Sequence, residues 1–112
     1  RHALDLDIEP GKLANVHFGL GRVQYMIDQD ALAVDSFSRA IALRPGEARY
    51  YRHRAEALEF TGNQVEAIAD YTRAIALTPD DADLYISRAA LLIRRWRILR
   101  ALSDLWQAVR LP

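Results

Sequence analysis

The chain has 112 residues, of which 51% are hydrophobic, with no net formal charge at pH 7 and no cysteine. This length fits one compact domain with a continuous core, whereas the zero net charge argues against a field that attracts nucleic acid or anionic lipid. No apolar run reaches the roughly 18 residues of a membrane-spanning helix, and the lack of cysteine excludes disulfides and thiolate metal sites.

The first thirteen residues are predicted to end a preceding helical element. The Pro10-Gly11 pair is a signal that stops a helix, and it resembles a second Pro-Gly pair later in the chain. We therefore expect residues 1–13 to be an N-terminal stub, either the end of an earlier repeat or a capping segment. Because the sequence begins with Arg1 rather than Met, we also expect it to be a piece of a longer protein.

From residue 14 onward, apolar residues recur with the period of a helix, and short polar or glycine-containing turns separate the segments. The pattern predicts helices over residues 14–27, 31–43, 48–60, 65–77 and 82–94. The last stripe of apolar residues keeps the same register up to Leu111.

The third turn is unlike the others. Its residues, Arg95-Trp96-Arg97, include no Gly, Asn or Pro. Since the apolar stripe after them stays in register, we predict a break near residues 95–97. One unbroken helix over residues 82–110 is the alternative.

The segment from Arg39 to Pro45 returns almost verbatim from Arg73 to Pro79, which is a shift of 34 residues. Such self-similarity indicates one structural unit used several times. Three positions are small in every unit, which allows helix axes to approach to roughly 8–10 Å. We therefore expect these positions to form the contact between paired helices: Gly21, Ala55 and Ala89; Ala33, Ala67 and Ala101; Ala40, Ala74 and Ala108.

This pattern resembles the tetratricopeptide repeat (TPR), a 34-residue helix–turn–helix unit with an Ala-x3-Phe motif and a closing proline. The second unit carries the family's residues in order: Tyr51, Ala55, Leu58, Ala67, Tyr71, Ala74 and Pro79. The resemblance implies an all-α, right-handed α-solenoid of three stacked units, over residues 14–47, 48–81 and a truncated 82–112. The chain departs from the pattern at His17, which replaces an aromatic, and at Arg54 and Arg88, where Leu is usual.

The resemblance also implies a function. In the family the first helix of each unit lines a concave groove that binds a peptide or protein segment. Here the groove positions are Asn15, Phe18, Arg22, Tyr25, Arg49, Arg52, His53, Glu56, Phe60, Asp83 and Ile86.

The clamp by which some TPR domains grip the C-terminal carboxylate of chaperones is not reproduced, and Asp83 would repel a carboxylate. Arg49 and Arg52 could instead attract an acidic side chain near the middle of the groove.

Other functions are less well supported by the residues. The apolar last helix, with Leu99, Leu102 and Trp106, offers a second hypothesis: self-association or docking onto a flanking domain. A third, nucleic-acid binding by the basic cluster around Trp96, is disfavoured because the rest of the chain is not basic.

His53 and Glu56 have the spacing of two metal ligands without an apparent third, and no motif for nucleophilic catalysis occurs. We therefore predict a non-enzymatic protein that needs no metal or other cofactor.

Overall fold

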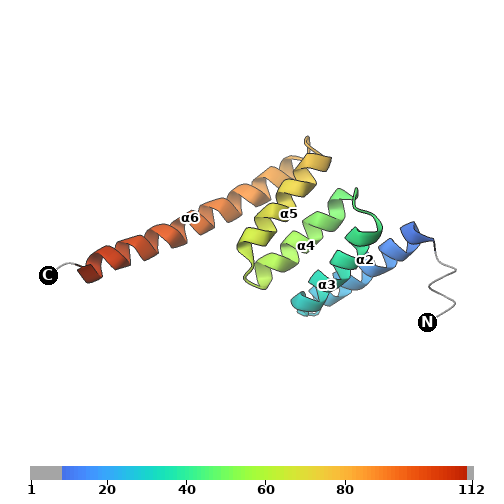
Figure 1. The fold of residues 1–112 in the computed structure, drawn as a ribbon, viewed down its shortest axis with the longest axis horizontal. Coiled ribbons are helices and arrows are strands. Elements are labelled where there is room, and N and C mark those ends of the chain that lie inside the picture. The colour runs from blue at the N-terminus through green and yellow to red at the C-terminus, as the bar shows by residue number, and fades with distance from the viewer. Residues whose placement is uncertain (1–8, 111–112) are drawn as a thin grey trace.

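The structure, a computed structural model, describes residues 9–110, and within this range it contains five α-helices and no strand. The four shorter helices form two antiparallel hairpins, and one long helix follows them (Figure 1). Together they span about 70 × 32 × 20 Å. The helices are α2 (Pro10–Met26), α3 (Asp30–Leu43), α4 (Ala48–Phe60), α5 (Gln64–Leu77) and α6 (Ala82–Arg110).

Helix α2 begins earlier than predicted. Pro10 occupies the start of the helix, where its missing N–H is no loss because the first N–H groups of a helix have no partner within it. Residues 10–13, which were assigned to the stub, therefore belong to the first helix. The rest of the predicted stub, residues 1–8, lies outside the described residues.

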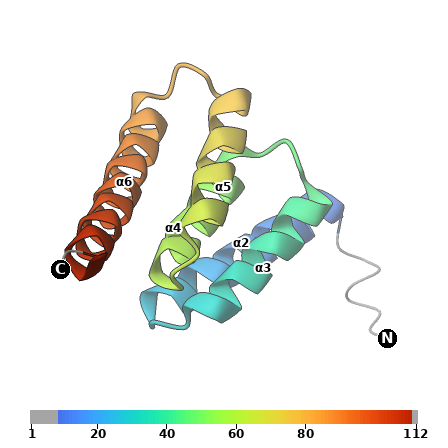
Figure 2. The ribbon, with the colours of Figure 1, turned by 60° about the vertical axis from the view of Figure 1, so that its left-hand side comes forward.

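The first two turns share one backbone feature. Asp28 and Gly62, which are 34 residues apart, both have positive φ, of 63° and 83°. Gly adopts this left-handed conformation without steric cost, and Asp tolerates it better than most residues. Each turn therefore reverses the chain so that α2 packs on α3 and α4 packs on α5 (Figure 2).

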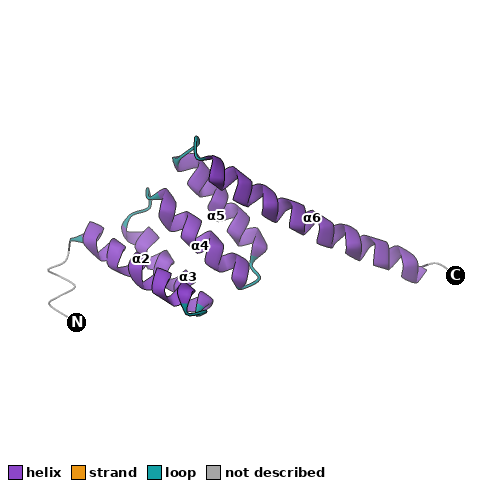
Figure 3. Cartoon of the chain, turned by 180° about the vertical axis from the view of Figure 1, so that it is seen from behind, coloured by secondary structure: helices purple, strands orange, loops and turns teal. Residues whose placement is uncertain are grey.

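The third turn does not form, and α6 runs unbroken through residues 95–97. The predicted break is thus wrong and the alternative of a single helix is confirmed. Trp96 occupies the register of Asp28 and Gly62. A bulky side chain with positive φ is strained, so the local sequence favours helix at this point. The last part of α6 projects away from the two hairpins (Figure 3).

The core forms two clusters, each centred on one hairpin and extended by residues of the following helix, and the small residues lie within them. Ala33 and Ala40 pack with Phe37 and Phe18, while the second cluster repeats this arrangement around Tyr71. All four alanines of α3 and α5 in this register are fully buried. The predicted contact between paired helices is therefore confirmed for the first two units.

Successive units are joined by contacts that repeat with the same 34-residue shift. The Tyr51 hydroxyl donates to the carbonyl of Pro45 at 2.9 Å, and the Tyr85 hydroxyl donates to that of Pro79 at 2.8 Å. The guanidinium of Arg54 donates to the Ser38 hydroxyl, just as Arg88 donates to Thr72. The first half of α6 is thus stacked on the second hairpin as the second hairpin is stacked on the first.

Candidate functional site

The groove positions of α2 and α4 meet through Asn15. Its Oδ1 atom accepts hydrogen bonds from the Tyr50 hydroxyl at 2.6 Å and from Nη2 of Arg49 at 3.1 Å. Tyr50 is fully buried, whereas Arg49 and Asn15 are exposed. The bond therefore holds the exposed guanidinium of Arg49 in a defined place at the boundary between the first two units.

Phe18 forms the floor beneath this boundary and is not an accessible groove contact. Its side chain is only 6% exposed, and it packs against the Tyr50 and Phe37 rings at centroid distances of 4.9 and 5.7 Å. Little of the Phe18 side chain is therefore available to a ligand, because these rings cover it. The guanidinium groups of Arg49 and Arg22 lie over the same ring, at 5.0 and 5.9 Å from its centroid. A cation over an aromatic face is attracted by the ring quadrupole.

The middle of α4 carries both signs of charge. His53 Nδ1 lies 3.2 Å from a carboxylate oxygen of Glu56, and the Arg52 guanidinium lies 3.5 Å from Nε2 of the same ring. The His53 ring also packs edge-on against Phe18. No group of three or more metal-ligating residues occurs among residues 9–110, so this pair has no further ligand there.

An aromatic pair lies near the end of α2. Tyr25 meets Phe60 edge-on at a centroid distance of 5.6 Å, and both line a shallow cavity of about 250 Å³ with Met26. Phe60 is 70% exposed. Burial, followed by the nearby carboxylates of Glu56 and Asp30, raises the pKa of the Tyr25 phenol above its ordinary value. The phenol therefore stays neutral and can serve as a hydrogen-bond donor.

A larger cavity of about 380 Å³ lies where α4 meets the start of α6. Its lining includes Arg49 and Arg52, Asp81 and Asp83, and also Glu47, whose carboxylate lies 3.9 Å from Nε of Arg49. Charges of both signs therefore line one cavity. Ile86, the remaining predicted groove residue, is 65% exposed on α6.

Glu59 lies on α4 in the register that the sequence assigns to the groove, beside Phe60. Its Oε2 accepts a 2.6 Å hydrogen bond from the Tyr71 hydroxyl, and Oε1 lies 3.9 Å from Arg94. Burial and this hydrogen bond raise the pKa of Tyr71 well above its ordinary value. Glu59 thus joins α4, α5 and α6 at one point.

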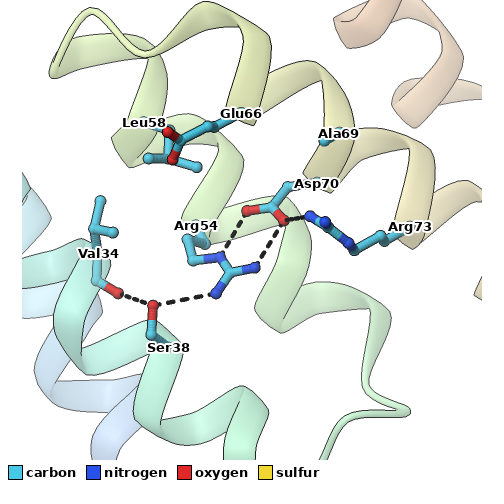
Figure 4. A pocket seen from close by; sticks show the side chains of 8 residues that line it. All are labelled: Val34, Ser38, Arg54, Leu58, Glu66, Ala69, Asp70 and Arg73. Carbon is cyan, nitrogen blue, oxygen red and sulfur yellow. Dashed lines mark hydrogen bonds and ion pairs between the residues drawn. The ribbon is translucent and has the colours of Figure 1, made fainter.

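A buried ion pair escaped prediction. Asp70 is fully buried on α5, and its two oxygens accept from Nη2 and Nε of Arg54 at 2.8 and 2.7 Å (Figure 4). Arg73 adds a third contact at 2.6 Å, and the Arg54 guanidinium reaches Ser38 on α3. These residues line a cavity of about 330 Å³. The hydrogen bonds that Arg54 donates to Asp70 raise the pKa of Arg54 above its ordinary value. Arg at a usual Leu position was the only signal in the sequence.

The predicted docking residues of the last helix are all accessible. Leu99, Leu102 and Trp106 are exposed, and the Arg110 guanidinium lies 4.4 Å from the centroid of the Trp106 ring. The basic cluster is spread along the same helix, with Arg100 over the Trp96 ring.

No model of a known protein family and no curated protein matches this chain. Solved structures do match it. The Arabidopsis OM64 TPR domain superposes with a TM-score of 0.75 and 25% identity, over 90% of this chain and 84% of that one. This chain is a TPR-like domain.

Two crystal structures of MamA are also similar to the TPR-like domain. One has a TM-score of 0.74 and 25% identity, covering 90% of this chain and 58% of that chain. The other has a TM-score of 0.72 and 26% identity, covering 86% and 52%. The TPR-like domain thus spans little more than half of either MamA chain.

The likeness to TPR domains suggests a protein–protein interaction module, a role that is typically non-catalytic. Within residues 9–110, no helix of the TPR-like domain combines the length and the apolar character needed to cross a bilayer.

Proposed function

We propose that this TPR-like domain binds an extended segment of a partner protein in the groove formed by α2, α4 and the first half of α6. The observation that supports this most is the set of cations at the boundary of the first two units. Arg22 and Arg49 converge on one buried aromatic ring, and Arg52 follows on the next turn of α4. Arg22 and Arg49 are already held in place by the ring, so they lose less conformational entropy when a ligand binds, and this favours binding.

The chemistry of the groove defines the segment. An Asp or Glu side chain of the partner lies at Arg22 and Arg52, because guanidinium groups pair with carboxylates through charge-assisted hydrogen bonds. An apolar side chain of the partner lies on Tyr25 and Phe60. The anionic residue Asp83 on the far side excludes a second carboxylate and favours a basic residue there.

A charge-reversal variant tests this proposal. Short peptides selected from a random display library against the domain should carry an acidic residue next to an apolar one. Arg22→Glu combined with Arg52→Glu should weaken their binding at least about tenfold, which corresponds to about 1.4 kcal/mol. The measurement is fluorescence anisotropy, with circular dichroism to check that helix content is retained.

The matched control is Arg39→Glu combined with Arg110→Glu, which makes the same change in charge outside the groove. This control should bind the selected peptides like the parent chain. Equal losses in the two variants would show that net charge alone is responsible, and retained binding in the groove variant would place the site elsewhere.

A further inference from the structure

The second half of α6 keeps the register of a TPR second helix but lacks its packing. Leu105 is 64% exposed, whereas its counterparts Phe37 and Tyr71 are 1% and 2% exposed. Val109 is 82% exposed against 8% for Ile75. The small residues Ala101 and Ala108 are likewise exposed, although their counterparts in both hairpins are fully buried.

The first half of α6 likewise leaves exposed the positions that its counterpart α4 buries. Leu92 is 47% exposed, whereas its counterpart Leu58 is 5% exposed, and Ala89 is exposed where Ala55 is fully buried. In the second hairpin α5 covers this surface of α4. The molecule therefore presents both sides of a helix–helix contact that it does not itself make.

A charge pair identifies the contact. Arg88 has the register of Arg54, and Asp104 has that of Asp70, so the pair that joins α4 to α5 is encoded again in α6. Arg88 already repeats the bond of Arg54 to the preceding unit. Along a straight helix, sixteen residues place Arg88 and Asp104 about 24 Å apart, so one copy cannot pair them.

The turn that would bring the two halves of one chain together is disfavoured. Trp96 stands where the other two units have a residue with positive φ, and it remains helical. A second chain removes this obstacle, because two straight helices that pair side by side need no turn.

We propose that two copies of this chain exchange the second halves of α6 and form a two-fold symmetric dimer. The two α6 helices lie antiparallel, so that Arg88 of each copy pairs with Asp104 of the other. Trp96 is midway between these residues in the sequence and lies at the two-fold axis. Because both copies contribute the same helix, each contact occurs twice in the interface, once in each direction. Leu102, Leu105 and Val109 of one copy then cover Ala89 and Leu92 of the other.

This interface does not include every exposed residue of the helix. The counterpart of Leu99 is Val65, which is itself 58% exposed. The counterparts of Trp106 are Ser38 and Thr72, which contact the next unit instead. Leu99 and Trp106 therefore lie outside the exchanged contact. The dimer is independent of groove binding, since its defining contacts lie on other faces.

Reversed charges test the exchange. Arg88→Asp alone opposes two aspartates at both symmetric contacts, and Asp104→Arg alone opposes two arginines. Each variant should self-associate at least about a hundredfold more weakly than the parent chain, because like charges in an interface are strongly disfavoured. An equimolar mixture should recover the dimer, since both contacts between the two variants then join opposite charges. Sedimentation equilibrium measures the association.

The control is Arg110→Asp, whose counterpart Ala76 on α5 is exposed and whose guanidinium lies over Trp106, outside the exchanged contact. This variant should dimerise like the parent. Dimerisation of the parent that neither reversal weakens, or a mixture that stays monomeric, would overturn the proposal. A parent chain that is monomeric at all concentrations would also overturn it.

A crosslink keeps the proposal testable if a reversal prevents folding. The chain has no cysteine, so the double variant Ala89→Cys, Ala101→Cys contains only the two thiols introduced. These positions are the counterparts of Ala55 and Ala67, which lie together in the core of the second hairpin. Oxidation should yield a covalent dimer on a non-reducing gel. A disulfide within one chain would instead show that α6 folds back on itself, which contradicts the exchange.

Discussion

At the scale of the residue, the paired helices of the first unit can approach closely because one contact position is a glycine, which has no side chain. Gly21 of α2 faces Phe37 of α3, and a Cβ atom at Gly21 would lie 2.5 Å from Cε1 of that ring. In the second unit the same register holds Ala55 opposite Tyr71. The first hairpin therefore needs glycine at this point because its helices and its aromatic ring leave no room for a methyl group.

The first prediction concerns this glycine. Gly21→Ala should lower the free energy of unfolding by roughly 1–3 kcal/mol, because the ring must move to admit the methyl group. Gly19→Ala on the same helix is the control, since a Cβ there meets no atom within 4 Å. That control should be neutral or stabilising by roughly 0.5–1 kcal/mol. Urea denaturation measures both, and a stable Gly21→Ala variant would refute the close contact.

At the scale of the element, a buried ion pair holds α4 to α5 and reaches back to α3. Asp70 has no exposed surface, and its three contacts within hydrogen-bond distance come from Arg54 and Arg73. A buried carboxylate requires such partners because the loss of hydration is costly. The same guanidinium that satisfies Asp70 also joins the two units through Ser38. The pair therefore specifies both the pairing of helices and the stacking of hairpins.

Removal of one partner should be costly. Asp70→Asn leaves the Arg54 guanidinium without its carboxylate and should destabilise the domain by about 3 kcal/mol, toward the lower end of the range for such pairs because Arg54 is partly exposed. Arg54→Leu combined with Asp70→Leu should be less destabilising, because it removes both charges at once. Thermal denaturation compares the two. A double variant that is less stable than Asp70→Asn would contradict this account.

At the scale of the whole molecule, the shape is decided by whether α6 bends. Two hairpins and one straight helix extend over 70 Å with a Cα radius of gyration of 17.8 Å. The cavity between α4 and the start of α6 is lined by no residue beyond Leu84, and the second half of α6 projects away from the hairpins (Figure 1). Bending at Trp96 would shorten the molecule without changing the groove boundary at Arg49.

A third turn can be introduced by substitution. Arg95→Thr, Trp96→Gly and Arg97→Asn together copy the turn of the second unit, Thr61-Gly62-Asn63, whose glycine has positive φ. At concentrations where the chain is monomeric, small-angle X-ray scattering should show a radius of gyration below that of the parent chain. The control keeps Trp96 and changes only its two neighbours, and it should stay extended. An equally extended triple variant would show that Trp96 does not decide the shape.

The sequence predicted the four shorter helices, the first two turns and the small residues between paired helices of the first two units, because each depends on a local or periodic signal. The 34-residue shift even carries over to single hydrogen bonds, such as those of Tyr51 and Tyr85. The candidate groove was assigned by resemblance, and the structure changed its content. Phe18 lies buried beneath the surface, because it packs against rings of α3 and α4 that are distant from it in sequence.

The repeat register can be read from the sequence alone, since the equal spacing of small and large side chains is a property of the order of the residues. The straight course of α6 became clear only from the fold, because the register of the third unit predicts a turn while the residues at that turn favour helix. The turn residues prevailed because bending there requires a strained backbone at Trp96. The packing that would compensate for this strain is absent from the described chain.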